Sequence, residues 1–282
     1  MSTGSNMTGK ICVVTGANSG IGRETAAGLA ARSAQVVMVC RNEAKGNEAR
    51  ESIQRATGNS QIDLLVADLA SLQDVRALAE SFNERYKRLD VLIHNAGIMK
   101  PKREVSADGF ELQFAVHFLA PFLLTHLLLD ALKAAAPSRV INLASMLHRL
   151  GHINFDDLQA EQRYNMFRTY ASSKLATIMF TYLMADRLRG TGVTVNCLHP
   201  GVIGSNLESN PKFIRPFLKS PRKGADTPIY LATSPDVAEV TGQYFVNRKP
   251  RRTSRESYDR VVAERLWALA EEVTGLHQAK AA

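Results

Sequence analysis

The segment ICVVTGANSGIG, residues 11–22, is the clearest indication of architecture in this chain. An apolar run rich in Val and Ile, Lys10–Thr15, is typical of a buried strand, and a helical stretch to about Arg32 follows the glycine-rich turn. Glycines in such a turn allow the backbone to bend tightly and to approach a pyrophosphate at the helix N-terminus. The turn residues expected to bind the phosphates are Gly16, Asn18, Ser19, Gly20, Ile21 and Gly22.

The same alternation of apolar strands and amphipathic helices continues along the chain. Further strands are expected at Val36–Cys40, Ile62–Ala67, Val91–His94, Val140–Ala144, Val193–Leu198 and Gln243–Val246. Two helices end near Thr57 and Tyr86, a long buried helix runs from about Leu112 to Ala136, and another runs from about Met166 to Arg189. This alternation predicts an α/β protein, a Rossmann-type doubly wound parallel sheet of about seven strands in a single domain.

The composition agrees with a globular domain. Of 282 residues, 45% are hydrophobic and 22% charged, and no apolar run reaches the roughly 18 residues that span a bilayer. Residues 1–6 are polar and rich in Gly and Ser, so we expect a disordered leader before a domain at 7–282. Cys12, Cys40 and Cys197 lie in strand-like runs, so they are expected as small buried hydrophobes rather than metal ligands or disulfides. A cytoplasmic location fits reduced thiols.

The formal net charge of +8 is concentrated in part in the stretch Arg248–Arg255. This stretch is either a basic patch for nucleic acid or a solvated loop before the last helix, and the loop is the favoured interpretation. A pocket for a phosphorylated cofactor would also use local positive charge. We therefore expect a small-molecule substrate and no nucleic-acid partner.

The end of the second expected strand distinguishes between the two nicotinamide cofactors. An Asp or Glu at this point binds the ribose hydroxyls of NAD and repels a 2′-phosphate. Here Cys40 is followed by Arg41, with Asn42 and Lys45 close behind, so no carboxylate occupies the position and a guanidinium is available to a phosphate. The pattern favours NADP(H).

Tyr170 and Lys174 are four residues apart in an expected helix, so they share one face of it. A tyrosine has a pKa of about 10 and exchanges protons poorly near neutral pH. An ammonium nearby favours the phenolate and is expected to lower that pKa. The pair is a plausible acid/base device, although many surface helices carry the same spacing.

Taken in order, these motifs resemble the short-chain dehydrogenase/reductase superfamily in its simple one-domain form, from Met7 to about Leu276. The matches are the glycine turn, Asp68-Leu69, Asn95-Ala96-Gly97, Ser145, the Tyr170/Lys174 pair and Pro200-Gly201. The chain looks most similar to the retinol-dehydrogenase-like branch. The pointers are His94-Asn95-Ala96-Gly97, the 24 residues between Ser145 and Tyr170, and His199-Pro200-Gly201-Val202.

The resemblance implies a role for each matched residue. Ser145 would hydrogen-bond the substrate oxygen, Tyr170 would be the acid in reduction and the base in oxidation, and Lys174 would hold the nicotinamide ribose. Asp68 would bind the adenine amino group, and Asn95 would stiffen the fourth strand. The other positions implied in cofactor binding are Leu69, Ala96, Gly97, Pro200, Gly201, Val202 and Ser205.

One position departs from the family pattern. The superfamily usually has an Asn in the long buried helix, which helps to hold a water that relays protons to the active-site Lys, and His117 stands at this position. The water is held either by a backbone carbonyl, which His117 also offers, or by an amide, which it lacks. His117 is therefore either a fourth catalytic residue or a satisfied core histidine. Pro121 should also kink or break this helix.

Two further expectations concern surfaces. The region at about 201–222 breaks the alternation with prolines and apolar side chains, which suggests a lid over the substrate pocket. The superfamily usually forms subunit contacts through the long buried helix and the helix that carries Tyr170, so we expect a homodimer or homotetramer. The side chains that would face either a partner or the core are Leu175, Ile178, Met179 and Tyr182.

The leading interpretation is an NADP(H)-dependent oxidoreductase that transfers a hydride between nicotinamide and a carbonyl or alcohol group of an apolar or bulky substrate. The alternative is an NADP(H)-binding regulatory or scaffold protein with little turnover. The complete set of Ser145, Tyr170 and Lys174 favours the enzyme, whereas only His117 supports the alternative.

Overall fold

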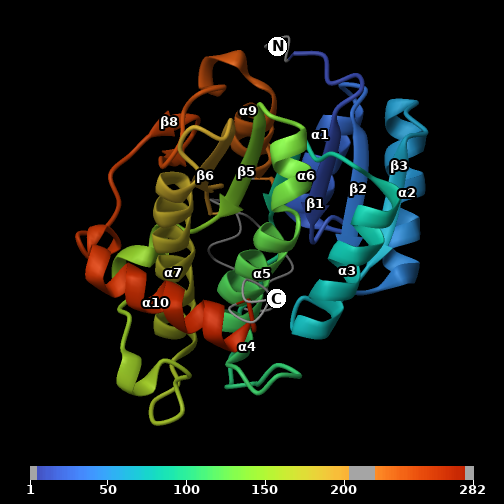
Figure 1. Ribbon diagram of the computed structural model, residues 1–282. Coiled ribbons are helices and arrows are strands. Elements are labelled where there is room, and N and C mark those ends of the chain that lie inside the picture. Colours follow the sequence, from blue (N-terminus) through green and yellow to red (C-terminus); the bar gives the residue numbers. More distant parts are fainter. Residues whose placement is uncertain (1–4, 203–219, 277–282) are drawn as a thin grey trace.

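A single mixed sheet organises the protein. The computed structural model describes residues 5–202 and 220–276. Within these residues eight strands form one sheet in the order β3-β2-β1-β4-β5-β6-β7-β8 (Figure 1). The first seven strands pair in parallel, and the short β8 pairs antiparallel with β7. The predicted doubly wound parallel sheet in a single α/β domain is confirmed, with β8 as an unpredicted addition at the edge.

The predicted strands agree with the observed ones to within two residues at each end. The strands are β1 Ile11–Thr15, β2 Gln35–Cys40, β3 Ile62–Val66, β4 Val91–His94, β5 Ser138–Leu143, β6 Val193–His199, β7 Tyr244–Val246 and β8 Lys249–Pro250. The α-helices are α1 Gly20–Ala30, α2 Glu43–Thr57, α3 Leu72–Arg85, α4 Leu112–Phe114, α5 Ala120–Leu127, α6 Leu129–Ala134, α7 Met166–Arg187, α8 Pro221–Gly224, α9 Asp226–Thr233 and α10 Arg260–Val273.

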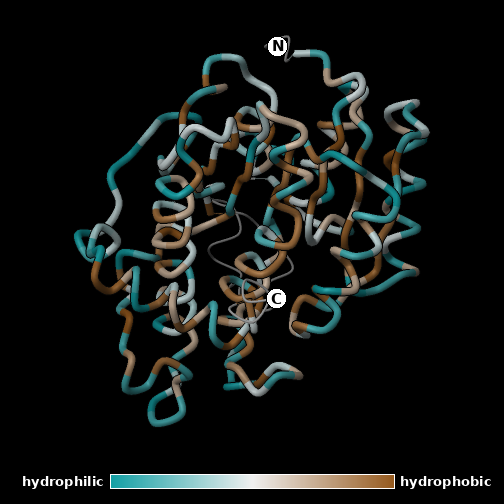
Figure 2. The backbone as a smooth tube through the Cα atoms, in the orientation of Figure 1, coloured by the Kyte–Doolittle hydropathy of each residue, from teal (hydrophilic) through white to brown (hydrophobic). Residues whose placement is uncertain are grey.

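Helices cover both faces of the sheet. Side chains of α1, α2 and α9 form one core with the strands, and those of α3, α5, α6, α7 and α10 form the other. Figure 2 shows the central strands as largely hydrophobic and the connecting loops as hydrophilic. Strands that are buried on both faces need continuous apolar runs rather than alternating ones. The sequence therefore predicted most of these strands.

The long buried helix is broken, as the position of Pro121 predicts. Because Pro121 has no N–H, it cannot donate to the carbonyl of His117 four residues earlier. The chain therefore widens into a π-helical turn at Ala115–Leu119 before α5 continues. The hydroxyl of Thr177 lies 3.0 Å from the freed carbonyl oxygen and gives it a partner on α7.

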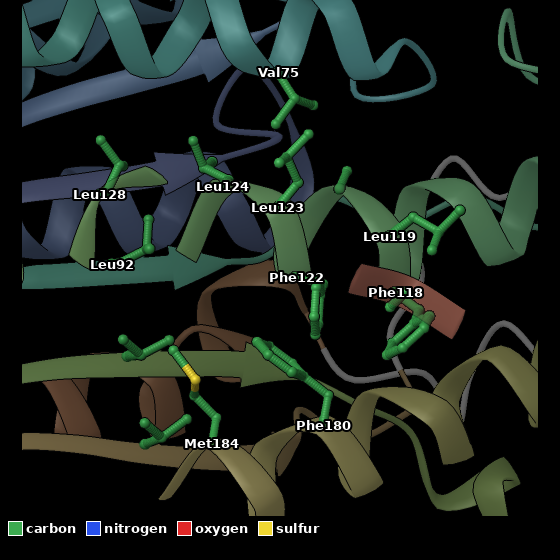
Figure 3. Close-up of a cluster of buried hydrophobic side chains, with 14 of the residues drawn as sticks. Val75, Leu92, Phe118, Leu119, Phe122, Leu123, Leu124, Leu128, Phe180 and Met184 are labelled. Atoms are coloured by element: carbon green, nitrogen blue, oxygen red, sulfur yellow. The ribbon is translucent and has the colours of Figure 1, made fainter. Parts of the chain in front are cut away.

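The core between α5, α7 and α10 is aromatic. Figure 3 shows Phe118 and Phe122 pointing from their helix towards Phe180 of α7, and the ring centroids of Phe122 and Phe180 are 5.6 Å apart. On the outer side, Trp267 of α10 contacts Phe122 edge-on at 4.9 Å. The guanidinium of Arg187 lies 4.0 Å from the Trp267 ring, so α10 packs across α5 and α7 (Figure 1).

This packing decides which way four α7 side chains face. Leu175, Ile178 and Met179 are at most 1% exposed and lie in cores of their own chain. Tyr182 is half-buried, and its hydroxyl lies 3.0 Å from that of Thr253. These side chains therefore face the core, and a homo-oligomer remains a prediction that would use another surface.

Other expectations have mixed outcomes. The three cysteines are free and buried, as predicted. The basic stretch, expected as a solvated loop, includes the short exposed strand β8 before the loop, and Arg248 pairs with Asp226 of α9. Most of the expected lid at 201–222, with Ser205, and most of the expected leader lie outside the described residues. No helix of the described chain combines the length and apolarity that crossing a membrane requires.

Candidate active site

The site begins where the chain changes direction across the sheet. β1 lies between β2 and β4, so the chain runs from β1 to β2 and β3 on one side and then crosses to β4 on the other, and sheets with this order bind ligands at the carboxyl ends of the two central strands. The glycine turn lies at this point. A Cβ on Gly16 would lie 2.9 Å from the Cα of Ala96, and a Cβ on Gly22 would lie 2.2 Å from the oxygen of Gly16. These two glycines let the turn pack against its neighbours.

Gly20 has a different reason to be glycine. Its φ of +55° is in the left-handed region, and a Cβ there would meet no protein atom within 4 Å. The first residue of α1 thus borders open space, with the amide groups of the helix N-terminus beside it and no acidic residue in the first turn. This is the arrangement that a dinucleotide pyrophosphate requires, so the residues fit a nicotinamide dinucleotide.

Asn95 joins β4 to the glycine turn. Its side-chain amide donates to the carbonyl of Thr15 at 2.8 Å, and the Thr15 hydroxyl accepts from the backbone amides of Asn95 and Ala96, each at 3.0 Å. The stiffening that the resemblance implied for Asn95 therefore has a structural basis. Thr15, the last residue of β1, was not predicted, although a buried hydroxyl at a strand end is a usable signal.

The expected adenosine end lies at the carboxyl ends of β2 and β3. The Arg41 side chain is 76% exposed, and its Nη1 lies 3.6 Å from an Asp68 carboxylate oxygen. An ion pair this exposed is weak, so it leaves the guanidinium available to another anion. Asn42 caps α2 by accepting from the Lys45 amide at 2.9 Å, which gives it a local structural role. Leu69 is only 9% exposed and lies within the apolar core.

Three expected catalytic side chains converge at the end of β5. Ser145 follows this strand, and its hydroxyl accepts from the Leu147 amide at 3.2 Å. Tyr170 and Lys174 come from the first half of α7. The Lys174 ammonium donates to the carbonyl of Leu143 at 2.9 Å and lies 5.6 Å from the centroid of the Tyr170 ring.

The electrostatics of this group differ from the expectation. Burial raises the pKa of Tyr170, although the hydrogen bond with Ser145 opposes the change. Burial also lowers the pKa of Lys174 to about 7. The expected lowering of the Tyr170 pKa by Lys174 was wrong, because desolvation penalises both charged forms and a lysine with such a pKa is only partly charged at neutral pH. The phenol is thus a protonated donor beside the Ser145 hydroxyl.

His117 is buried against this group and fully hydrogen-bonded. Its Nε2 accepts from the amide of Ile98 at 3.0 Å, so its proton lies on Nδ1, which donates to the Ser173 hydroxyl at 2.8 Å. Burial and the nearby Lys174 hold its pKa well below the ordinary 6.5. Its ring meets that of Tyr170 edge-on at 5.4 Å. These are the contacts of a satisfied core histidine, and a catalytic role for it stays a prediction.

The remaining expected cofactor residues follow the ends of β4 and β6. A Cβ on Gly97 would lie 3.3 Å from His117 Nε2 and 3.7 Å from Lys174 Nζ, so Gly97 borders both groups. Gly201 after β6 has a φ of +104°, which glycine tolerates, and Val202 is 54% exposed. Pro200 stands between β6 and this turn.

Known proteins share this arrangement. A family model described as short chain dehydrogenase matches residues 10–212. The chain belongs to the short-chain dehydrogenase family. Retinol dehydrogenase 14 of Homo sapiens is 44% identical to it, over 96% of this chain and 88% of that protein. Retinol dehydrogenase 12 of Bos taurus is 43% identical, over 95% and 87%. The resemblance to the retinol-dehydrogenase-like branch is thereby confirmed.

Solved structures share the fold of this short-chain dehydrogenase. An uncharacterized protein from Mycobacterium Paratuberculosis is 32% identical with a TM-score of 0.82, over 97% of this chain and 96% of that one. A short chain dehydrogenase from Escherichia coli CFT073 complexed with NADPH is 28% identical with a TM-score of 0.72, over 86% and 97%. Family membership makes this protein an oxidoreductase of the short-chain dehydrogenase class.

Proposed function

We propose that this short-chain dehydrogenase is an NADP(H)-dependent enzyme that interconverts a carbonyl group and an alcohol on an apolar substrate. The observation that carries the proposal is the hydrogen-bonded pair of Ser145 and Tyr170 beside buried Lys174, at the same sheet edge as the open glycine turn. Two hydroxyls that converge on one point can bind a single substrate oxygen from two directions.

In reduction, the bound nicotinamide supplies the hydride. The Ser145 hydroxyl donates to the substrate oxygen and orients it, and the Tyr170 phenol transfers its proton to that oxygen. At neutral pH the phenol carries the proton that this direction needs, but its raised pKa makes it a weak acid, so the transfer depends on the negative charge that develops on the substrate oxygen. Lys174 would exchange its hydrogen bond with Leu143 for one with the cofactor ribose. The other cofactor residues would keep the roles that the resemblance implies, with Asp68 at the adenine.

The proposed NADP(H) preference rests on Arg41. An exposed guanidinium stands where NAD-specific sites carry an acidic residue, and a guanidinium can bind a phosphate through two parallel hydrogen bonds. The nearest anion to it is Asp68, at 3.6 Å, and that residue is itself proposed to meet the adenine. The short chain dehydrogenase from Escherichia coli CFT073 mentioned above is a complex with NADPH, which supports the same choice.

The proposed substrate is an apolar aldehyde or alcohol of the retinoid kind. Support comes from the names of the related retinol dehydrogenases and from exposed large apolar side chains that are close in sequence to the site residues. Four of these are about half exposed or more, and they follow Ser145, open α7 or follow β6: Met146 49%, Leu150 67%, Phe167 53% and Val202 54%. Leu150 and Phe167 line one pocket together with Ser173 of α7, and exposed apolar side chains at a pocket favour an apolar ligand.

The test is oxidation of NADPH, followed by absorbance, with all-trans-retinal and a panel of smaller aldehydes and ketones. Tyr170→Phe removes only the proton donor, so it should bind NADPH normally and lose almost all turnover. Binding of NADPH without turnover of any panel member would instead favour the regulatory or scaffold protein. A monomer mass in light scattering at micromolar concentration would contradict the proposed homodimer or homotetramer.

A further inference from the structure

We propose that His148 is a positioning residue for Ser145, and that it couples this serine to the segment 252–256 far along the chain. His148 touches neither substrate nor cofactor in this proposal. The expected change in kcat rests on the proposed function, whereas the expected change in hydrogen exchange around Ser145 does not.

The hydrogen bonds of the His148 ring define its protonation. The ring is fully buried, with Nδ1 2.6 Å from the carbonyl oxygen of Ser145 and Nε2 3.1 Å from the backbone nitrogen of Ser254. A backbone amide can only donate, so Nε2 must accept and the proton must lie on Nδ1. Both bonds therefore form only when His148 is neutral with its proton on Nδ1. Burial, which lowers the pKa of His148, favours that form.

The Ser145 carbonyl is held from two sides by this residue. The backbone amide of His148 donates to it at 3.2 Å, and Nδ1 donates at 2.6 Å. Ser145 is in an extended conformation and begins a short 3-10 helix at Met146–Leu150, with its hydroxyl against the Leu147 amide. Because the Ser145 carbonyl is held in place, the backbone that carries the Ser145 hydroxyl is held in place as well. That hydroxyl must meet a substrate oxygen within a few tenths of an ångström.

The segment 252–256 is a firm anchor for the other side of the ring. The Arg149 guanidinium donates to the carbonyl of Arg252 at 2.6 Å, and the Ile153 amide donates to the Glu256 carboxylate at 2.8 Å. Thr253 is buried between Ser257 and Tyr182 of α7, at 2.6 Å and 3.0 Å. The segment is thus hydrogen-bonded to α7 as well as to the loop after Ser145. His148 is the residue that bonds both to this segment and to Ser145 itself.

Substitutions can separate the two bonds of the ring. In His148→Asn the side-chain amide nitrogen replaces Nδ1, so the bond to Ser145 is kept and the bond to Ser254 is lost. In His148→Gln the amide oxygen replaces Nε2, so the bond to Ser254 is kept and the bond to Ser145 is lost. If His148 positions Ser145, the Asn variant should lose much less activity than the Gln variant, and the small loss in the Asn variant measures the coupling to Ser254.

The kinetic arm measures retinal reduction by NADPH. We expect kcat to fall about 10- to 100-fold in His148→Gln and His148→Ala and less than about threefold in His148→Asn. KM and the Kd for NADPH should change less than about twofold in all three, because the substrate and cofactor surfaces are intact. His152→Gln is the control: this side chain lies in the same loop, is 75% exposed and lies 2.9 Å from Glu256, so the substitution removes a contact with the segment 252–256 but neither bond of His148. Equal kcat values in the Asn and Gln variants, or a larger loss in Asn, would overturn the proposal.

A second arm needs no turnover. Hydrogen exchange of the peptide that covers residues 144–151 should be faster in the Gln and Ala variants than in the wild type, and much closer to the wild type in the Asn variant. If the wild type reduces no carbonyl while exchange still separates Asn from Gln, the proposed function fails and the positioning role stands. If exchange in this peptide is the same for Asn and Gln, the positioning role fails whatever the activity. The Asn and Gln pair decides the matter even if the Ala variant does not fold.

Discussion

Acidification from pH 8 to pH 5 is expected to lower the free energy of unfolding by about 4 kcal/mol through two buried histidines alone. Burial lowers the pKa of His94 to about 3, and burial with the nearby Lys174 holds the pKa of His117 well below 6.5. In the unfolded chain both return to the ordinary value of 6.5. Below that pH the unfolded state binds protons that the folded state does not, so stability falls as the pH falls.

The magnitude follows from the distance between pH 5 and the unfolded pKa. Each histidine that stays neutral in the folded state costs RT ln(1 + 10^1.5), or about 2 kcal/mol, at pH 5. His148, whose pKa is also lowered, adds a loss of the same sign. The pKa of Asp90 is lowered by its contacts with Arg88 and Lys10, so that carboxylate loses its contribution only at still lower pH, outside this window.

The assay is urea unfolding at pH 8, 7, 6 and 5, followed by the fluorescence of Trp267, the single and buried tryptophan. His117→Asn should be less stable at every pH, but its loss between pH 8 and pH 5 should be smaller than that of the wild type by about 2 kcal/mol. His152→Gln, at a 75% exposed position beside Glu256, removes no buried histidine and serves as the control. A wild-type stability that is constant from pH 8 to pH 5, or an unchanged loss in His117→Asn, would refute the reasoning.

Three further predictions concern the cofactor site and the core. Arg41→Ala should raise the Kd for NADPH about tenfold or more and leave that for NADH nearly unchanged; equal losses in fluorescence titrations would contradict the assignment. Gly22→Ala, whose Cβ would lie 2.2 Å from the Gly16 oxygen, should abolish NADPH binding and lower Tm; full binding would show that the backbone can move. Trp267→Ala should cost about 3–5 kcal/mol in urea unfolding by opening the contact with Phe122; a loss below about 1 kcal/mol would mean that α10 is not part of the core.

The fold was largely predictable because most of its strands are buried on both faces. Each of the seven parallel strands is an apolar run between polar segments, and a helix follows most of them. β8 could not be predicted, since Lys249–Pro250 is exposed, carries a charge and has no donor at the proline. It pairs antiparallel with the edge of β7 that no other described strand covers. The helix expected at 112–136 was predicted only in part. Pro121 indicates that the helix breaks, but it does not reveal the π-helical turn that precedes the proline.

The sequence predicted the residues of the candidate site whose motifs have a characteristic spacing. It did not predict the pKa changes that follow from burial. Ser145, Tyr170 and Lys174 were named from their motifs, and the structure brings them together. The direction of the Tyr170 pKa was wrong, because helical spacing reveals a neighbouring ammonium but not the desolvation that removes its charge. His148 was missed, because its partner Ser254 is 106 residues away and no short pattern contains both.

The departure at His117 is best understood together with Pro121. The proline removes the amide that would bond to the His117 carbonyl, and the hydroxyl of Thr177 lies 3.0 Å from both this carbonyl and that of Ser173. The ring of His117 in turn donates to Ser173, whose hydroxyl donates to the carbonyl of Tyr170 at 2.8 Å. Helix termini and interruptions leave backbone groups without an intrahelical partner, and here side chains of α7 bond to them. The broken helix and the helix of Tyr170 are therefore joined by polar contacts next to the proton donor. A histidine suits this position because one ring bonds to both the Ile98 amide and the Ser173 hydroxyl while staying neutral beside Lys174.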